Sequence, residues 1–165
     1  MVTVHFVCGS IGAGKTAYAI ALARRIGAVR FSTEEWMSRL AAADGTDPSA
    51  PISWKAELVE RCELDMWTSV EKLIERGVNV VFDLAPSSRD HRDEMRGLVA
   101  QTRAVSKLHY LDVGRDTRRA RIVERNRERS TATLEVTEEL FDWIDRQFEP
   151  PTDDELYGAM IVCED

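Results

Sequence analysis

Eight residues near the N-terminus have the types and spacing of a phosphate-binding loop. Residues 9–16 read Gly-Ser-Ile-Gly-Ala-Gly-Lys-Thr, which fits the pattern G-x-x-x-x-G-K-[ST]. Glycines let the backbone turn tightly and bring its N–H groups close to an anion without a Cβ clash. These N–H groups, with the positive end of a following helix, can surround phosphate oxygens. The residues predicted to hold the phosphates are Gly9, Ile11, Gly12, Ala13, Gly14, Lys15 and Thr16.

Two side chains at the end of this loop can do more than shape it. Lys15 can reach the β- and γ-phosphates of a nucleoside triphosphate as a mobile point charge. The Thr16 hydroxyl can ligate Mg²⁺, which prefers oxygen ligands and substrate phosphates. The motif therefore predicts that the chain binds ATP with Mg²⁺. GTP stays open as the nucleotide, because base recognition comes from dispersed contacts that no short motif reveals.

A phosphate-binding loop of this type follows a strand and precedes a helix, and the flanking segments fit both. Residues 2–8 are mostly apolar and β-branched, as expected of a buried strand. Residues 17–25 are rich in strong helix formers, which predicts a helix from about Lys15 to Ile26 with Gly27 as its C-terminal cap. The motif thus stands between a strand and a helix.

Two acidic residues are candidates for chemistry beside the loop. Asp83 ends the most strand-like segment, residues 78–84, and in open parallel sheets ligands bind outside the carboxyl ends of strands. Glu34 follows a short predicted strand over 28–31. A capping box formed by Ser32 and Glu35 explains those two residues but leaves Glu34 without a structural reason. Asp83 also has a structural alternative, as a turn-forming or helix-capping residue.

Arginines gather in two rows at helical spacing. The first row, on a helix predicted to open at residues 87–90 and to run to about 102, is either a solvated face or a binding surface for acceptor or phosphate. The second row, on a predicted helix over 118–129, includes arginines that repel one another unless anions neutralise them. Phosphoryl transfer needs such cations, and a planar guanidinium suits phosphate contact, so this row predicts a phosphate-clamping arginine. The rows are Arg89, Arg92 and Arg96, and Arg118, Arg121, Arg125 and Arg129.

The other predicted elements complete an alternating α/β pattern. The apolar residues of a long helix over 54–76 recur at helical spacing and are interpreted as core. A strand is predicted over 104–113, a helix after Thr137, and a last strand over 160–163, with loops over 43–53, 130–134 and 148–155. The loop over 43–53 is a candidate for shaping the acceptor pocket.

Composition limits the classes of protein that fit. The chain has 165 residues, 44% of them hydrophobic, which suffices for one domain with a proper core. A net charge of -7 gives no global attraction to nucleic acid or acidic lipid. No apolar run approaches a membrane span, and the N-terminus enters a strand directly, so we expect a cytoplasmic protein. Three cysteines, at 8, 62 and 163, lack metal-like spacing and are expected to be buried and reduced, and the three histidines receive no role.

These features resemble P-loop kinases of the group that contains zeta-toxin-like, chloramphenicol-phosphotransferase-like and polynucleotide-kinase-like enzymes. Beside the phosphate loop, residues 31–36 look like that group's strand-end S-x-D-x-W region, and Arg125-Asn126 looks like its lid R-N pair. The segment Phe-Glu-Pro-Pro-x-x-x-Glu at 148–155 looks like the tail of a subgroup of predicted kinases. The resemblance implies one P-loop domain over 1–165, a three-layer fold with a five-stranded parallel sheet between helices, and a small Arg-rich lid at about 115–135.

The resemblance also implies roles for single residues. Lys15 and Thr16 match the phosphate and Mg²⁺ contacts, and Arg121 and Arg125 match the lid arginines. Glu34 stands where these kinases usually have an aspartate that takes the proton from the acceptor hydroxyl. Asp83 is the alternative base or a Mg²⁺ contact, and we place Glu34 ahead of it. On the acceptor side, Arg92 is the match, and Arg89 joins it as a candidate substrate-binding residue.

The sequence therefore predicts an ATP-dependent kinase that phosphorylates a hydroxyl group of a small molecule. One alternative is a polynucleotide 5′-hydroxyl kinase, which needs a basic groove that only the arginines at 89, 92 and 96 offer. Another is a non-catalytic ATP-binding switch or plain NTPase, which needs no acceptor base. The identity of the acceptor and the oligomeric state are left open by the sequence.

Overall fold

The fold is built on a central parallel sheet with helices on both faces. The computed structural model describes residues 1–44, 52–83, 88–128 and 135–164. Its strands are β1 (Thr3–Cys8), β2 (Val29–Ser32), β3 (Val80–Asp83), β4 (Val105–Val113) and β5 (Met160–Glu164). Its helices are α1 (Lys15–Ile26), α2 (Thr33–Asp44), α3 (Ile52–Glu75), α4 (Arg89–Ala100), α5 (Arg115–Glu128), α6 (Glu138–Gln147) and α7 (Asp153–Leu156).

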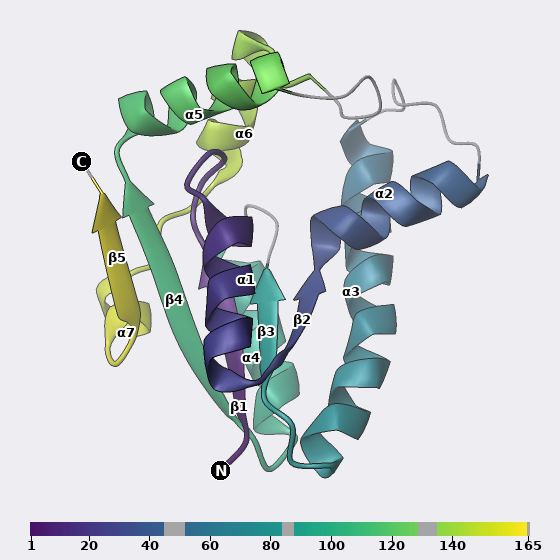
Figure 1. The fold of residues 1–165 in the computed structure, drawn as a ribbon. Coiled ribbons are helices and arrows are strands. Elements are labelled where there is room, and N and C mark those ends of the chain that lie inside the picture. Colours follow the sequence, from purple (N-terminus) through teal and green to yellow (C-terminus); the bar gives the residue numbers. More distant parts are fainter. Residues whose placement is uncertain (45–51, 84–87, 129–134, 165) are drawn as a thin grey trace.

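The strand order places the ends of β1, β2 and β3 at one edge of the sheet. The five strands are all parallel and run in the order β2-β3-β1-β4-β5 (Figure 1). Val7 of β1 is in register with Asp83 of β3, which is in register with Ser32 of β2. Val7 leads into the phosphate loop, Asp83 ends the neighbouring strand, and Glu34 follows the strand beyond it, so the two predicted acids lie at the same edge of the sheet as the loop.

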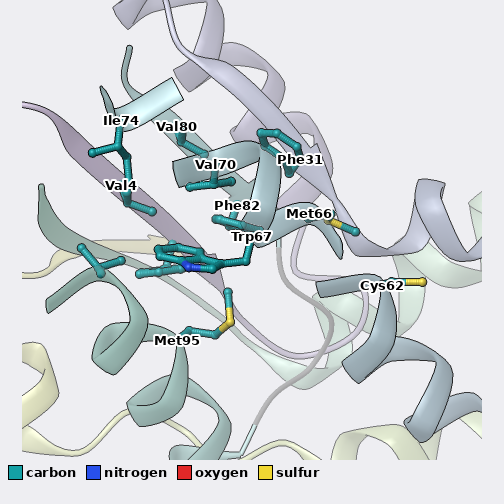
Figure 2. Close-up of a cluster of buried hydrophobic side chains, with 12 residues drawn as sticks. Val4, Phe31, Cys62, Met66, Trp67, Val70, Ile74, Val80, Phe82 and Met95 are labelled. Carbon is teal, nitrogen blue, oxygen red and sulfur yellow. The ribbon is translucent and has the colours of Figure 1, made fainter. Parts of the chain in front are cut away.

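Two apolar clusters hold the helices against the sheet. On one face, α3 and α4 pack on alternate residues of β1, β2 and β3, with Phe6, Phe31 and Phe82 at the centre. Figure 2 shows Trp67 and the other side chains of α3 meeting these strands. On the other face, α1 packs on Val7, Val81, Leu111 and Val113. Of the six apolar residues predicted as core within α3, Cys62, Met66, Val70 and Ile74 are buried in the first cluster. Leu73 packs against that cluster, and Val59 is half-buried outside it.

The predicted architecture is confirmed, and the differences are local. The arginine-rich helix starts at Arg115, three residues earlier than predicted. Residues 153–156 form the short helix α7 where a loop was expected, because Thr152 and Glu155 make a capping box. Residues 43–44 and 52–53 are helical, so the predicted loop over 43–53 was too long. The rest of that loop, residue 84, the loop over 130–134 and Arg129 lie outside the described residues. Cys163 is exposed, contrary to expectation, because it lies on the edge strand β5.

A chain of three rings joins α1 to the sheet. His109 of β4 lies 2.8 Å from His5 of β1, Nε2 to Nδ1, and its Nδ1 lies 2.8 Å from the Tyr18 hydroxyl of α1. Burial lowers the pKa of His109 from 6.5 to about 4, with the neighbouring His5 acting in the same direction. The folded protein therefore favours the uncharged imidazole at this position.

This pKa shift predicts a pH-dependent contribution to stability. In the unfolded chain His109 binds a proton near pH 6.5, whereas in the folded protein it does so only near pH 4. Its contribution is complete above pH 6.5 and is lost progressively on acidification towards pH 4. We expect the free energy of unfolding, measured in urea, to fall from pH 7.5 to pH 5 more steeply for the wild type than for His109→Gln. Equal slopes for the two proteins would contradict this assignment.

Candidate active site

The phosphate loop has the backbone that its glycines were expected to allow. It follows β1 and leads into α1, with Gly14 as the N-cap of that helix. Gly12 and Gly14 have φ values of 79° and 89°, in the left-handed region that favours glycine. A Cβ added at Gly12 would lie 2.5 Å from the carbonyl oxygen of Arg118, so the loop packs directly against the backbone of α5. Both the turn and this close approach need glycine at position 12.

Positively charged side chains bind the carbonyl oxygens of the loop. The Lys15 ammonium donates to the carbonyls of Gly9 and Ser10 at 3.0 and 3.2 Å. Two guanidinium groups of α5 donate to the next carbonyls, Arg118 to Ile11 at 3.3 Å and Arg121 to Ala13 at 3.2 Å. In a trans peptide the C=O and the following N–H point in opposite directions. The N–H groups that follow these carbonyls therefore point away from these cations.

Lys15, Thr16 and Asp83 come together in front of the loop. Asp83 is 4% exposed and accepts a hydrogen bond from the Thr16 hydroxyl. Burial raises the pKa of Asp83, while Thr16, Lys15 and Arg30 act against that rise. Burial likewise lowers the pKa of Lys15, and the charge of Asp83 opposes the change. The structure thus brings together three of the residues that the sequence singled out.

Glu34 stands at the same edge of the sheet as Asp83 and is exposed to solvent. Its charge acts on the pKa values of both Lys15 and Asp83, which places the three groups within electrostatic reach. Glu34 is in the first turn of α2, and the Ser32 hydroxyl accepts from the N–H of Glu35 at 3.4 Å, as the predicted cap requires. Both acids considered as base candidates therefore lie beside the lysine.

Arg30 is a site residue that the sequence did not reveal. Its guanidinium donates to Asp83 at 3.2 Å and also contacts the Glu35 carboxylate. The Glu35 carboxylate is thus paired with an arginine, whereas the sequence had assigned it to the capping box. Arg30 lies one strand away from Asp83, and that pairing becomes visible only when the strand order is known.

The second arginine row has different surroundings at each position. Arg118 is buried, and its Nε donates to the Val113 carbonyl at 2.9 Å. Arg121 is half-buried between the Ala13 carbonyl and the Glu164 carboxylate. Arg125 is exposed one turn further along α5. Of the two predicted lid arginines, Arg121 therefore touches the phosphate loop directly. Arg118, which belongs to the same row but was not predicted as a lid arginine, also touches the loop.

Asn126 connects α5 to Val136, which lies just before α6. Its side-chain amide donates to the Val136 carbonyl at 2.8 Å and accepts from the Val136 N–H at 3.2 Å. This pair of hydrogen bonds joins the last turn of α5 to the residues that enter α6. The Asn of the R-N pair thus has a structural function, which the sequence did not assign to it.

The arginines of the first row, on α4, pair with acidic residues that follow α6. Arg92 is 2% exposed, and its Nε and Nη2 donate to the two Glu155 oxygens at 2.9 and 2.8 Å. Arg96 pairs with the same carboxylate at 3.3 Å, and Arg89 pairs with Asp154 at 2.8 Å. The hydrogen bonds from Arg92 lower the pKa of Glu155 to about 2. Arg92 is therefore buried against Glu155, whereas Arg89 is exposed and its ion pair with Asp154 lies at the surface.

A second buried polar network joins α2, α3 and α4. Glu63 of α3, 4% exposed, accepts from the Thr33 hydroxyl at 3.0 Å and lies 2.5 Å from Nε2 of His91 in the first turn of α4. The hydrogen bond to Glu63 raises the pKa of His91, against the effect of burial. Since Thr33 precedes Glu34, this network ties the candidate base to α3 and α4.

The described residues hold no group of three or more His, Cys, Asp or Glu side chains that could bind a metal ion on their own. None of the helices within the described ranges is long and apolar enough to cross a membrane. Thr16 and Asp83 offer oxygen atoms side by side, and a hard cation such as Mg²⁺ can share these with phosphate oxygens and water. The donor set fits a cation that arrives with a nucleotide.

A family model described as an AAA domain, AAA_33, matches residues 4–151 of the chain. The chain belongs to this AAA domain family. The match begins in β1 and covers the phosphate loop, both acids and the helices that carry the arginines. No curated protein matches the sequence significantly.

Solved structures of two kinases and of Kti12 share the fold at low sequence identity. A sugar kinase from Janibacter sp. HTCC2649 has a TM-score of 0.71 at 16% identity, over 99% of this chain and 86% of its own. The APS kinase CysC of Mycobacterium tuberculosis, in complex with AMPPNP and APS, has 0.65 at 16%, over 99% and 89%. Chaetomium thermophilum Kti12, in complex with ADP-AlF3, has 0.68 at 14%, over 98% and 89%. These likenesses establish the P-loop fold of this AAA domain.

The close approach of Gly12 to α5 yields a matched pair of substitutions. Gly12 and Gly27 both have positive φ, but only Gly12 has a backbone atom within reach of an added Cβ. Gly27→Ala should cost about 1–2 kcal/mol for the left-handed backbone alone and leave MgATP binding unchanged. Gly12→Ala should destabilise the domain more and weaken MgATP binding, as measured by urea unfolding and calorimetry. Equal effects of the two substitutions would show that the packing of the loop on α5 does not matter.

Proposed function

We propose that this protein is an ATP-dependent kinase that transfers the γ-phosphoryl group to a hydroxyl group of a small molecule. One observation carries the proposal: Lys15, Thr16 and Asp83 converge in front of a loop whose carbonyl oxygens are bound by cations, and Glu34 lies within electrostatic reach of them. A nucleotide-binding module without chemistry needs the loop but not two acids beside it. The fold shared with a sugar kinase and an APS kinase supports the same function.

The phosphate loop fits a triphosphate, and its residues would hold the nucleotide in defined ways. The backbone N–H groups of residues 12–16 and the N-terminus of α1 bind the β- and γ-phosphates. Lys15 exchanges its carbonyl partners for phosphate oxygens, because a charge-assisted hydrogen bond to phosphate is the stronger one. Thr16 and Asp83 would hold Mg²⁺, which supplies charge neutralisation on the phosphate oxygens when bound.

The reaction that these residues support is an in-line displacement. An acceptor hydroxyl oxygen forms a bond to the γ-phosphorus while the bond from that phosphorus to the β–γ bridging oxygen breaks, so that ADP leaves. The proton of the hydroxyl passes to a carboxylate of the protein. Lys15 and Arg121 stabilise the charge that develops on the transferred oxygens, and Arg125 contributes once the nucleotide is bound. The protein's side chains mainly position the two reactants and neutralise the charge on the transferred phosphoryl group.

Glu34 is the carboxylate that we propose as the base. Asp83 is buried, and its oxygens already accept hydrogen bonds from Thr16 and Arg30, which suits a residue that orients the Thr16 hydroxyl and a cation. Glu34 is exposed at the end of β2, where an acceptor molecule can reach it. Glu63, through Thr33, ties the backbone before Glu34 to α3. This division gives each acid one role.

A small-molecule acceptor is favoured over a polynucleotide by the pairing of the α4 arginines. A polynucleotide 5′-hydroxyl kinase needs a basic groove, and binding that falls steeply with salt would be its signature. The arginines that the sequence offered for this groove are paired with Glu155 and Asp154. The net charge of -7 also disfavours a polyanionic acceptor.

Labelled ATP tests the proposal. The protein is incubated with γ-labelled ATP, Mg²⁺ and panels of sugars, other hydroxyl-bearing metabolites, antibiotics and 5′-hydroxyl oligonucleotides, and the products are separated. We expect label to transfer to a small molecule. Lys15→Ala should lower that transfer about a hundredfold or more, because it removes a cation from the transferred phosphoryl group. Glu34→Gln should lower it about 10²–10⁴-fold, as loss of a general base does.

Three outcomes would contradict the proposal. Full activity of Lys15→Ala would show that the loop does not serve the reaction. Full activity of Glu34→Gln would show that Glu34 is not the base. Hydrolysis of ATP with no labelled acceptor, unchanged in both acid variants, would favour the NTPase or switch. Far-UV circular dichroism of each variant serves as the control for folding.

A further inference from the structure

Asp145 of α6 is bound directly to the phosphate loop, although no motif singles it out. Its Oδ1 accepts from the Ser10 hydroxyl at 2.6 Å and from Nη1 of Arg118 at 2.7 Å. Ser10 and Asp145 are 135 positions apart in the sequence. Both side chains lie in shielded positions, Ser10 at 5% exposure and Asp145 at 17%. The contact therefore joins the first turn of the loop to a helix from the far end of the chain.

Arg118 is the second half of the same connection. The guanidinium that pairs with Asp145 also donates to the carbonyls of Ile11 and Val113, at 3.3 and 2.9 Å. It stacks over the Phe141 ring of α6, with 5.7 Å from Cζ to the ring centroid. The backbone of Arg118 is what Gly12 packs against. Asp145 thus sets the position of an arginine that touches the loop with its side chain and its main chain.

We infer that Asp145 is a positioning residue for the phosphates of the nucleotide. It acts through Ser10 and Arg118, and it holds the loop in the shape that binds the triphosphate before the nucleotide arrives. A loop ordered in advance loses less conformational freedom on binding, so affinity rises without any new contact to the ligand. The inference rests on the proposed function, because it assumes that the loop binds a nucleotide.

The charge of Asp145 and its positioning of the loop have opposite expected effects on the affinity for phosphates. Asp145 carries a negative charge beside a site for anions, so Coulomb repulsion alone would make its removal strengthen phosphate binding. If Asp145 positions the loop, its removal weakens phosphate binding in spite of the lost charge. A purely structural role would lower the melting temperature and leave the affinity of the folded protein for phosphates unchanged. The sign of the affinity change therefore separates the three cases.

The experiment compares Asp145→Asn and Ser10→Ala with Asp142→Asn. Asp142 lies one turn earlier on α6 and pairs with Arg115 at 2.6 Å, an arginine that also lies 3.8 Å from Oδ2 of Asp145. The Asp142→Asn variant loses the same charge from the same helix and leaves the contacts of Asp145 with Ser10 and Arg118 in place. Affinities for MgATP and for magnesium with inorganic triphosphate are measured by calorimetry at a temperature where all variants are folded. Adenosine, which lacks phosphates, is titrated by ligand-observed NMR.

We expect Asp145→Asn and Ser10→Ala to weaken the binding of MgATP and of triphosphate about five- to tenfold, the loss typical of a hydrogen bond to a charged group. Adenosine affinity should not change, and Asp142→Asn should behave as the wild type. The combined Ser10→Ala and Asp145→Asn effects should be less than additive, because both substitutions act on the same Ser10–Asp145 contact.

Unchanged or tighter binding of MgATP by folded Asp145→Asn would overturn the inference, and so would an equal loss for adenosine. If Asp145→Asn does not fold, Ser10→Ala decides, because it leaves the Arg118–Asp145 pair intact, and wild-type affinity in that variant overturns the inference. A wild-type protein that binds neither MgATP nor triphosphate would refute the proposed function, and the inference would fall with it. The pattern that supports Asp145 as a positioning residue is weaker binding of MgATP and triphosphate in Asp145→Asn and Ser10→Ala, with wild-type binding in Asp142→Asn.

Discussion

The orientation of a few peptide groups between β1 and α1 is the constraint on which the site depends. A phosphate loop works only if its N–H groups face the anion, and each N–H is tied to the carbonyl of the preceding residue by the planar peptide. In this protein Lys15, Arg118 and Arg121 bind the carbonyls of the loop. Much of the remaining structure serves to place those cations, since two of them come from α5, which β4 leads into, and α6 supports the first of them through Asp145.

The arginines of α4 and those that face the phosphate loop are largely paired with carboxylates of the same chain. Arg92 and Arg96 share Glu155, Arg118 faces Asp145, and Arg30 lies between Asp83 and Glu35. A buried guanidinium without such a partner would be costly, because its desolvation would not be offset. These carboxylates therefore pair with arginines of the same chain. Among the described residues, Lys15, Asp83 and Glu34 lie within electrostatic reach of one another beside the loop, which fits the chemistry proposed for a hydroxyl group.

Local patterns made the fold and the centre of the site predictable, whereas long-range pairings were not. The spacing of residues 9–16 and the strand that ends at Asp83 were enough to place Lys15, Thr16 and Asp83 together, because parallel strands end at the same edge. Asp145, Glu63 and Arg30 escaped notice because their partners lie on other elements and no short spacing connects them. The pairing of Arg92 was missed for the same reason, since its partner Glu155 is 63 positions away.

Backbone amide NMR spectroscopy tests the central claim most directly. The amide resonances of the protein are assigned, and MgATP is added stepwise until the spectrum stops changing. If the N–H groups of the loop bind the phosphates, the amides of residues 12–16 shift most, with a saturation curve common to all of them. If MgATP binds while these amides keep their positions and others move, the nucleotide lies elsewhere, and the account given for the loop is wrong.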